Sequence, residues 1–203
     1  LQHATCAAIL DALRLPRKPT FYLSHNCEFE LAANAYTQRD KHDYACLMHQ
    51  LEYRACQYSD LVVPVSQEDG EKFVHLFAVR PDAVCVAGNG STDRFADADK
   101  PFPQPTNAAS AIFLGSKWGP NLGAAKYICT ELAAACPDIT FHICGNVCDE
   151  LRDIASRSNV LLHGILPDDA LGDLLETTHI GLNPILDGAG SNVKLADYLA
   201  HGL

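Results

Sequence analysis

The sequence predicts an α/β protein whose strands form parallel, doubly wound sheets in two domains. Short apolar runs alternate with segments of helical periodicity along most of the 203 residues. Strands and helices that alternate at this spacing form right-handed βαβ units, whose strands pair in parallel. Three prolines within residues 101–105 interrupt the alternation, which indicates a boundary between two such domains.

The second half of the chain carries the pattern most fully. Its expected strands are 111–114, 139–143, 160–163 and 180–185. A first helix is expected because apolar residues recur at helical spacing and share one face: Ala124, Ile128, Leu132 and Ala135. Asn121 precedes them and can cap its start. Three more helices are expected, over 148–156, from a capping sequence that opens at Pro167, and after Ser191.

The first half repeats the theme less completely. Its expected strands are 20–24, 61–65 and 83–87, and its expected helices are 41–58 and 67–78. We therefore expect residues 1–100 to be the C-terminal part of one domain, 101–108 to be a linker, and 109–203 to be a second domain truncated at its end. The first residue is Leu and the last three follow a helix-like run, which is typical of a piece of a longer chain.

Composition excludes several classes of protein. A formal charge of −10 leaves no electrostatic footprint for nucleic acid, so we expect no nucleic-acid partner. The chain has no apolar run long enough to cross a bilayer and no signal-peptide pattern, which favours a cytoplasmic location. Nine cysteines occur in an odd number without a CxxC pair, and runs such as Val84-Cys85-Val86 suggest buried reduced thiols.

The most informative segment is 183–202, where an expected strand ends in a Gly-Ala-Gly turn before a helix. Gly188 and Gly190 let an anion approach the backbone, and the N–H groups of the helix start face it. Lys194 adds a cation, and Asp197 on the same face can accept hydrogen bonds from ribose hydroxyls. The alternative is a simple tight turn followed by a solvated Lys–Asp pair, and spacing alone does not decide between them.

Three other groups of residues raise functional alternatives. His25, at the end of an expected strand, is either a ligand-facing residue or an inert loop histidine. His42, Cys46 and His49 share a helix face and have zinc-ligand chemistry, although helical spacing often produces such a set by coincidence, so we expect no metal. Cys144 and Cys148 have the spacing of a redox pair but lack an activating cation, so we interpret them as core or surface thiols.

Read end to end, the chain resembles the retaining family 4 glycosyltransferases of GT-B fold. The matching segments follow one another in the family's order over nearly the whole chain: His25-Asn26 with Glu28, Glu52, Ser59–Ser66, Asn89-Gly90 with Asp93 and Phe95, Phe113–Ser116, Pro120-Asn121, Phe141–Gly145, Asn159–Gly164, Gly188–Lys194, Asp197 and Ala200–Gly202.

The resemblance implies two facing Rossmann-like domains, the N-terminal one incomplete, with a nucleotide-diphosphate sugar on the C-terminal domain and a hydroxyl acceptor on the other. It places the diphosphate at Gly188, Gly190, Ser191 and Asn192. In the same way it implies that His25 faces the donor sugar and that Lys194 neutralises the leaving phosphate. The resemblance also implies that Asp197 binds the ribose. Three further residues of the implied donor site are Gly115, Ser116 and Lys117. The resemblance implies transfer with retention, without a metal or other cofactor, from a donor such as a UDP- or GDP-sugar.

Two departures from the family pattern keep other functions open. Ala189 stands where the common motif has its first Glu, and Ser116 stands where many members have Arg, with Lys117 following as the substitute. A catalytically inactive relative that serves as a binding or partner subunit, or a GT-B nucleotide-sugar epimerase, are the alternatives. The acceptor is a carbohydrate or a lipid-linked hydroxyl. Peripheral contact at the inner face of the membrane and the oligomeric state stay open.

Overall fold

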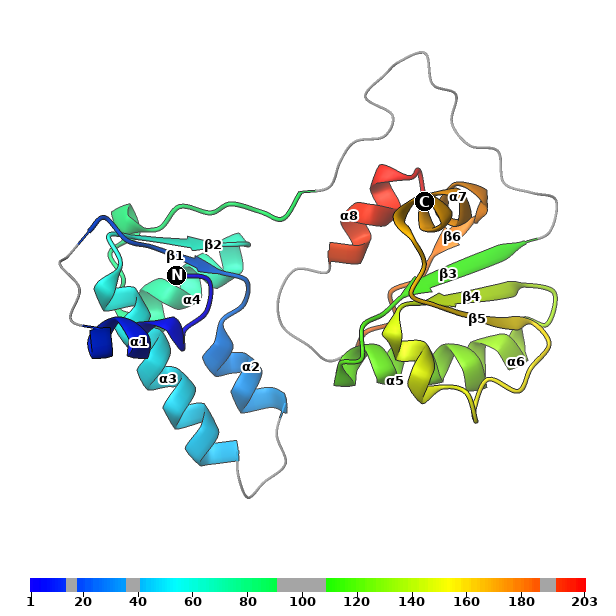
Figure 1. Cartoon of the computed structure of the whole chain (residues 1–203), viewed down its shortest axis with the longest axis horizontal. Coiled ribbons are helices and arrows are strands. Elements are labelled where there is room, and N and C mark those ends of the chain that lie inside the picture. Colours follow the sequence, from blue (N-terminus) through cyan, green and yellow to red (C-terminus); the bar gives the residue numbers. More distant parts are fainter. Residues whose placement is uncertain (14–17, 36–40, 91–108, 187–192) are drawn as a thin grey trace, which may run out of the picture. The chain divides into compact units, whose positions relative to one another are not determined.

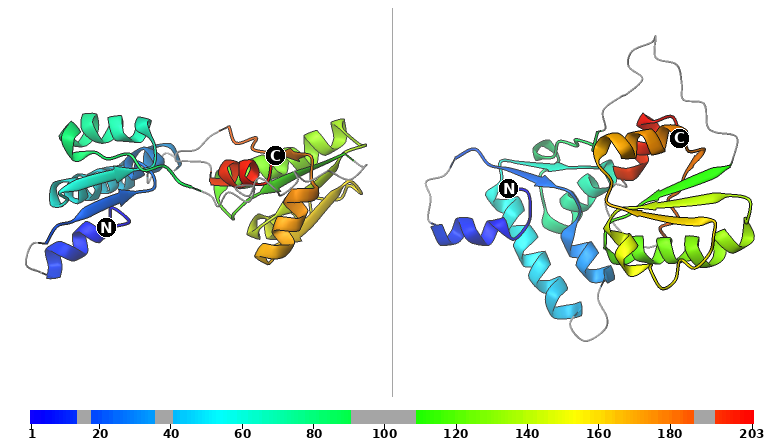
Figure 2. Two further views of the ribbon diagram at one scale, coloured as in Figure 1. Left: turned by 90° about the horizontal axis from the view of Figure 1, so that it is seen from above. Right: turned by 45° about the vertical axis from the view of Figure 1, so that its right-hand side comes forward.

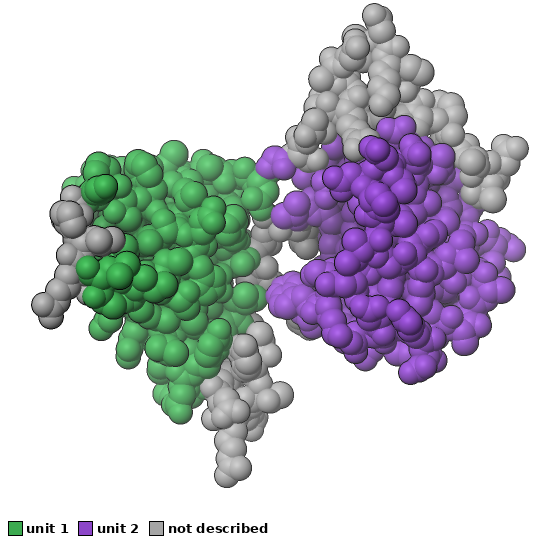
Figure 3. Space-filling model, viewed as in Figure 1, with its two compact units in different colours: residues 1–89, 188–191 green, residues 90–187, 192–203 purple. Residues whose placement is uncertain are grey.

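The computed structural model describes residues 1–13, 18–35, 41–90, 109–186 and 193–203. These residues form two compact units, which Figure 3 shows in different colours. Described residues up to 89 belong to unit 1 and those from 90 onward to unit 2. The predicted linker, 101–108, lies outside the described residues. Both units have parallel strands and covering helices, which confirms the α/β fold class.

Unit 1 contains a two-stranded parallel sheet covered by helices. Its elements are α1 (Cys6–Leu13), β1 (Phe21–Ser24), α2 (Glu28–Ala35), α3 (Lys41–Tyr58), β2 (Leu61–Pro64), α4 (Gln67–Phe77) and the 3₁₀ turn Pro81–Ala83. The two strands pair in register from Phe21–Leu61 to Ser24–Pro64. The predicted strand 83–87 is shorter than expected: it forms one bridge, between Val62 and Val84, and continues beside β2 through bonds from the backbone nitrogens of Cys85 and Ala87.

The core of unit 1 lies between this sheet and its helices. Tyr22 and Val62 are fully buried on the sheet, and Met48, Phe73 and Phe77 pack against them from α3 and α4. Such burial contributes roughly 1.5–3 kcal/mol for each large apolar side chain. The apolar faces of β1, β2, α3 and α4 thus form one core.

Unit 2 contains a four-stranded parallel sheet in the order β5-β4-β3-β6. Its elements are β3 (Ser110–Leu114), α5 (Gly119–Tyr127), the π turn Ile128–Leu132, α6 (Ala133–Ala135), β4 (Thr140–Cys144), the 3₁₀ turn Asn146–Glu150, β5 (Val160–Gly164), α7 (Asp168–Thr177), β6 (Ile180–Gly181) and α8 (Val193–Ala200). Residues Ser110 to Phe113 of β3 are all buried, as a central strand covered on both faces requires.

The two faces of this sheet have separate cores. Phe113 and Ile143 pack with Ile128 on the face covered by α5 and α6, whereas Ile112 packs with Leu175 of α7 and Tyr198 of α8 on the other. Figures 1 and 2 show α5 and α6 on one side of the sheet and α7 and α8 on the other. The doubly wound arrangement predicted from the alternation is therefore confirmed.

Several local predictions are wrong. Asn121 does not cap its helix, because α5 begins two residues earlier, at Gly119, and Asn121 lies within its first turn. The segment 148–156 forms a 3₁₀ turn and irregular turns rather than a helix, and β6 has two residues instead of six. Cys85 is exposed because its strand lies at the edge of the sheet. No helix in the described ranges is long and apolar enough to span a membrane.

Candidate functional site

The order of the strands in unit 2 locates a candidate ligand site at one end of the sheet. The chain proceeds from β3 outward to β4 and β5, and then returns to the other side of β3 to form β6. The order of strands therefore reverses between β3 and β6. In open parallel sheets, ligands bind at such a switch point, beside the carboxyl ends of the two strands. The loops after β3 and β6 lead into α5 and α8, so the N-termini of these helices belong to this end.

Lys194 of α8 lies at this switch point. Its ammonium nitrogen donates to Oδ1 of Asn121, in the first turn of α5, at 2.7 Å. The same nitrogen lies 4.5 Å from the centre of the Phe113 ring, on β3. Burial lowers the pKa of Lys194 to about 8, because desolvation disfavours the charged form. Within the described residues no carboxylate pairs with this ammonium, so an anion entering the site would supply its missing counter-charge.

The loop after β3 is joined to the same contact. Asn121 is 7% exposed, and its Nδ2 donates to the hydroxyl oxygen of Ser116 at 3.0 Å. A chain of hydrogen bonds thus runs from Ser116 through Asn121 to Lys194. The predicted donor-site residues Ser116 and Lys194 are therefore brought together through Asn121, which the sequence analysis treated as a helix cap and as part of a matching segment.

Lys117 is engaged elsewhere. Its ammonium forms an ion pair with Glu150, and its backbone N–H donates to Oδ1 of Asn146 at 2.6 Å. This pair raises the pKa of Lys117. The structure thus holds Lys117 against the turn after β4 rather than against Asn121.

Glycines lie at the carboxyl ends of the three neighbouring strands β3, β4 and β5. Gly115 follows β3, Gly145 follows β4 and Gly164 ends β5. The backbone N–H of Gly145 donates to the carbonyl of Gly164 at 2.7 Å, and that of Gly115 donates to the carbonyl of Cys144 at 2.9 Å. A Cβ on Gly145 would lie 2.1 Å from the carbonyl oxygen of Gly115, so only glycine lets the two loops approach this closely.

We predict that Gly145→Ala destabilises unit 2 whereas Gly123→Ala stabilises it. Gly145 has φ +101°, in the left-handed region, and a side chain there meets backbone, so a cost of about 1–3 kcal/mol is expected. Gly123, within α5, has open space where a methyl group would lie, and alanine there gains about 0.5–1 kcal/mol of helix propensity. Thermal unfolding of both variants measures the difference, and a stable Gly145→Ala protein would contradict the close approach.

Tyr198 fixes α8 over the switch point. Its hydroxyl accepts from the backbone N–H of Leu114 at 3.0 Å and donates to the carbonyl of Leu182 at 3.0 Å, so it joins the ends of β3 and β6. A Cβ on Gly181 would lie 2.5 Å from the Tyr198 ring, which explains the glycine there. Asp197 lies beside Tyr198 on α8, one turn beyond Lys194. The other predicted diphosphate-binding residues, Gly188, Gly190, Ser191 and Asn192, lie outside the described residues.

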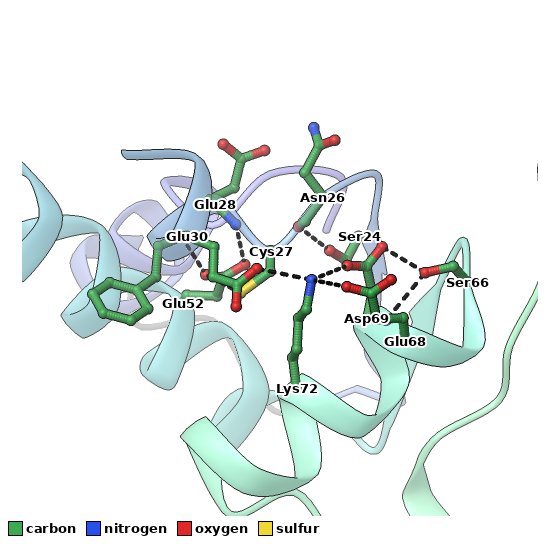
Figure 4. A network of polar contacts seen from close by, with 11 residues as sticks. Ser24, Asn26, Cys27, Glu28, Glu30, Glu52, Ser66, Glu68, Asp69 and Lys72 are labelled. Atoms are coloured by element: carbon green, nitrogen blue, oxygen red, sulfur yellow. Dashed lines mark hydrogen bonds and ion pairs between the residues drawn. The ribbon is translucent and has the colours of Figure 1, made fainter. Parts of the chain in front are cut away.

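A second group of polar residues surrounds the end of β1 in unit 1. His25 follows β1 directly and is exposed. The hydroxyl of Ser24 donates to the carbonyl of Asn26 across this turn, and Figure 4 shows the turn with the network around it. His25 thus lies at the carboxyl end of a parallel strand, as predicted.

Glu52 of α3 is the centre of this network. It is 0% exposed, and its two carboxylate oxygens accept from the hydroxyl of Tyr22 at 3.1 Å and from the backbone nitrogens of Glu28 at 2.9 Å and Phe29 at 2.8 Å. The thiol of Cys27 lies at 3.9 Å. Desolvation raises the pKa of Glu52 to about 7, against the opposing effect of these hydrogen bonds. Glu52 therefore caps α2 from within the core and holds both sides of the His25 turn.

Lys72 of α4 connects the network to the next strand. Its ammonium contacts Glu30 at 2.8 Å, Glu68 at 2.9 Å and Asp69 at 3.5 Å. The hydroxyl of Ser66 donates to Asp69 and also accepts from its backbone nitrogen at 3.1 Å, which caps α4. The ends of β1 and β2 are thus joined by ion pairs between α2 and α4 (Figure 4).

The metal and redox alternatives are not supported by the geometry. The described residues contain no cluster of three or more His, Cys, Asp or Glu side chains that could hold a metal ion. Cys46 approaches His42 at 3.7 Å, but His49 packs between the rings of Phe29 and Phe77 instead. Cys144 and Cys148 are both buried free thiols whose pKa burial raises, so they lack thiolate character at neutral pH.

Sequence reasoning missed the main roles of two residues. Glu52 was noted only as part of a matching segment, and Asn121 only as a cap and as part of another matching segment. A glutamate within a run of apolar helical positions is the signal that marks Glu52 as buried. No spacing in the sequence signals the contact between Asn121 and Lys194, because 73 residues separate them.

Comparisons with known proteins identify the fold. No family model and no curated protein matches the sequence. Among solved structures, HepE of Anabaena in complex with UDP aligns with 98% of this chain and 55% of its own, at 14% identity and a TM-score of 0.65. A TarM mutant of S. aureus, in complex with Fondaparinux, alpha-GlcNAc-glycerol and UDP, aligns with 90% and 35%, at 10% identity and a TM-score of 0.63.

A third structure gives the same result. The pneumococcal O-GlcNAc transferase GtfA, in complex with UDP and GlcNAc, aligns with 98% of this chain and 43% of its own, at 13% identity and a TM-score of 0.59. The chain thus spans about half or less of the length of these proteins. Their common architecture matches the parallel sheets described above. This chain has the α/β fold of the GT-B glycosyltransferases, with Rossmann-like domains.

Proposed function

We propose that this chain is part of a retaining glycosyltransferase that transfers a sugar from a nucleotide-diphosphate donor to a hydroxyl acceptor. The observation that carries the proposal is Lys194: a half-buried ammonium, held by a neutral amide at the switch point of the sheet. A diphosphate would supply the negative charge that no carboxylate among the described residues gives to this ammonium. Bound UDP in structures of the same fold, such as HepE and GtfA, supports the same class of ligand.

The chemistry that the site would perform is stabilisation of a leaving group. The bond between the anomeric carbon and the diphosphate oxygen breaks, and its electron pair goes to that oxygen. The acceptor hydroxyl bonds to the same carbon from the same face, and its proton goes to the departing phosphate. In this proposal Lys194 and the N-terminus of α8 balance the charge that develops on the phosphate, and the reaction needs no metal.

The other predicted residues have proposed roles in the same reaction. Asp197 accepts hydrogen bonds from the ribose hydroxyls, and His25 faces the donor sugar. Gly115 lets the loop after β3 pass close to the ligand, and Ser116 holds that loop to Asn121. Gly188, Gly190, Ser191 and Asn192 surround the diphosphate in this proposal. The acceptor is a carbohydrate or a lipid-linked hydroxyl.

The test of the function is release of a nucleoside diphosphate from a panel of UDP-, GDP- and ADP-sugars, with and without added sugar acceptors. The proposal predicts release from the sugars of one nucleotide, and a product that keeps the anomeric configuration of the donor. An inverted product would contradict retention. Nucleotide binding without turnover by the full-length protein would favour the binding-subunit alternative, and a changed sugar with no transfer would indicate an epimerase.

We predict that Asp197→Asn weakens binding of nucleosides and nucleotides to the same extent, by about tenfold, which corresponds to roughly 1.4 kcal/mol. The ribose is common to both ligands, and the substitution removes the charge that strengthens its hydrogen bonds. Asp173→Asn, at an exposed position of α7, makes the same change of charge away from the site and is the control. Calorimetric titration with uridine and UDP measures both. An effect on UDP alone would reassign Asp197 to the phosphates.

A further inference from the structure

Asn121 has an environment that fixes the orientation of its amide. It is buried in the first turn of α5, and its two ends have different partners. An ammonium can only donate, so the atom that faces Lys194 must be the amide oxygen. The amide nitrogen then faces the hydroxyl of Ser116, which accepts from it at 3.0 Å. One orientation of the amide is therefore consistent with the donors and acceptors of all three side chains.

The chemistry of an amide also explains why this position is neutral. A carboxylate at 121 would pair with Lys194 at the same distance and cancel its charge. It would also be stabilised by the N-terminus of α5 and would repel an incoming phosphate. Asparagine has the shape of aspartate without its charge. It can hold the ammonium in place while the positive charge stays available to a ligand.

The contact also joins two elements that are distant in the sequence. Lys194 lies in the first turn of α8, the helix that follows β6, whereas Asn121 and Ser116 follow β3. The ammonium also lies over the ring of Phe113, on β3, and makes a cation–π contact with it. Lysine carries four rotatable bonds, so without these partners its ammonium would sample many positions and binding would have to restrict it.

We infer that Asn121 is a positioning residue: it holds the ammonium of Lys194 at the switch point, ready for a diphosphate, without neutralising it. The inference rests on the proposed function, because it assumes that Lys194 binds the diphosphate of the donor. Asn121 acts through Lys194 and is not assigned a contact with the ligand. Ser116 keeps the amide in the required orientation.

The test compares Asn121→Asp and Asn121→Ala with Lys126→Ala. Lys126→Ala lowers the net charge by one, as Asn121→Asp does, but at the exposed last turn of α5. Calorimetry gives the affinity for UDP, GDP, ADP and pyrophosphate. The rate at which an acylating reagent modifies the Lys194 amine, followed across pH by peptide mass spectrometry, gives the titration of that amine. Ser116→Ala is a milder variant that keeps the test available if substitution of Asn121 prevents folding.

The inference predicts two linked results. Asn121→Asp raises the pH midpoint of Lys194 acylation by at least one unit and weakens diphosphate affinity more than tenfold, because the new carboxylate pairs with the ammonium. Asn121→Ala weakens affinity about three- to tenfold without raising the midpoint, and Lys126→Ala changes it less than twofold. A merely structural role of Asn121 would lower stability but would leave the Lys194 midpoint where it is.

The outcomes separate this inference from the proposed function. If the unsubstituted chain binds diphosphates and Lys194→Ala abolishes binding, but both Asn121 variants bind normally with an unchanged midpoint, the inference is wrong and the function stands. If the folded, unsubstituted chain binds no diphosphate, the proposed function is wrong and the inference falls with it, even where the Lys194 midpoint moves as expected.

Discussion

Replacing Lys194 with alanine is expected to weaken binding of the preferred nucleoside diphosphate by about 1.5–3 kcal/mol, or roughly 10- to 150-fold. The substitution removes a half-buried ammonium whose described partners, the Asn121 amide and the Phe113 ring, carry no negative charge. Binding of the nucleoside, which lacks phosphate, is expected to stay within a factor of two. Calorimetric titration with the diphosphate and the nucleoside measures both, and equal losses for the two ligands would contradict a phosphate contact.

The same lysine gives the interaction an expected pH dependence. Because the pKa of Lys194 is lowered to about 8 in the free chain, a growing fraction of the amine is neutral as the pH rises from 7 to 9. A bound diphosphate favours the protonated form, so binding takes up a proton and the affinity falls about tenfold over this range. Lys194→Arg keeps its charge at all these pH values, so its affinity is expected to be constant from pH 7 to 9.

Replacing Glu52 with alanine is expected to lower the free energy of unfolding of unit 1 by about 3–5 kcal/mol. The variant leaves the hydroxyl of Tyr22 and the backbone nitrogens of Glu28 and Phe29 buried without their acceptor, and it opens a cavity in the core. Urea unfolding followed by circular dichroism measures the loss. Amide hydrogen exchange locates the loss, because the exchange rate is expected to increase most at residues 28 and 29.

Glu52→Gln is the conservative variant at this position, and Asp43→Asn is the control with the same change of charge. Glutamine keeps one acceptor oxygen but places an N–H₂ group opposite a donor, so about 1–3 kcal/mol is expected to be lost. Asp43 is exposed on the same helix, and its substitution should change stability by less than about 0.5 kcal/mol. Equal stability of Glu52→Gln and the unsubstituted chain at every pH would contradict the role of the buried carboxylate.

The contribution of Glu52 to the free energy of unfolding is expected to decrease as the pH rises. Since burial raises the pKa of Glu52 from 4.5 to about 7, the folded chain binds one more proton than the unfolded chain between these values. The contribution of Glu52 is therefore complete below about pH 4.5 and is lost as the pH rises through 7. The difference in stability between the unsubstituted chain and Glu52→Gln should accordingly shrink between pH 5 and pH 8.

The fold could be predicted because its strands and helices have strong local patterns. The run Ser110–Leu114 is apolar after its first residue, as a strand buried on both faces must be, and Leu171, Leu174 and Leu175 define the inner face of α7. Boundaries were harder to predict where local and tertiary preferences compete. The segment 148–156 has apolar residues at helical spacing, yet after Cys148 and Leu151 are buried the chain turns back toward β5.

The candidate site could be predicted only in part. The sequence predicted a helix after Ser191 that carries Lys194 and Asp197, and α8 is that helix. Its partners could not be predicted, because the hydrogen bond between Asn121 and Lys194 joins helices α5 and α8, which follow the neighbouring strands β3 and β6 but are distant in the sequence. The apolar positions around Glu52 signal its burial, but its hydrogen bonds to the backbone of α2 depend on how α3 packs against α2.

A crystal structure of the chain with UDP would test the central claim, that a nucleoside diphosphate binds at the switch point of unit 2. The account predicts that a phosphate oxygen lies within hydrogen-bonding distance of the Lys194 ammonium, between the loops that follow β3 and β6. It also predicts that the ribose lies against Asp197. A diphosphate bound elsewhere on the chain, with Lys194 still on Asn121 and free of phosphate, would contradict the account.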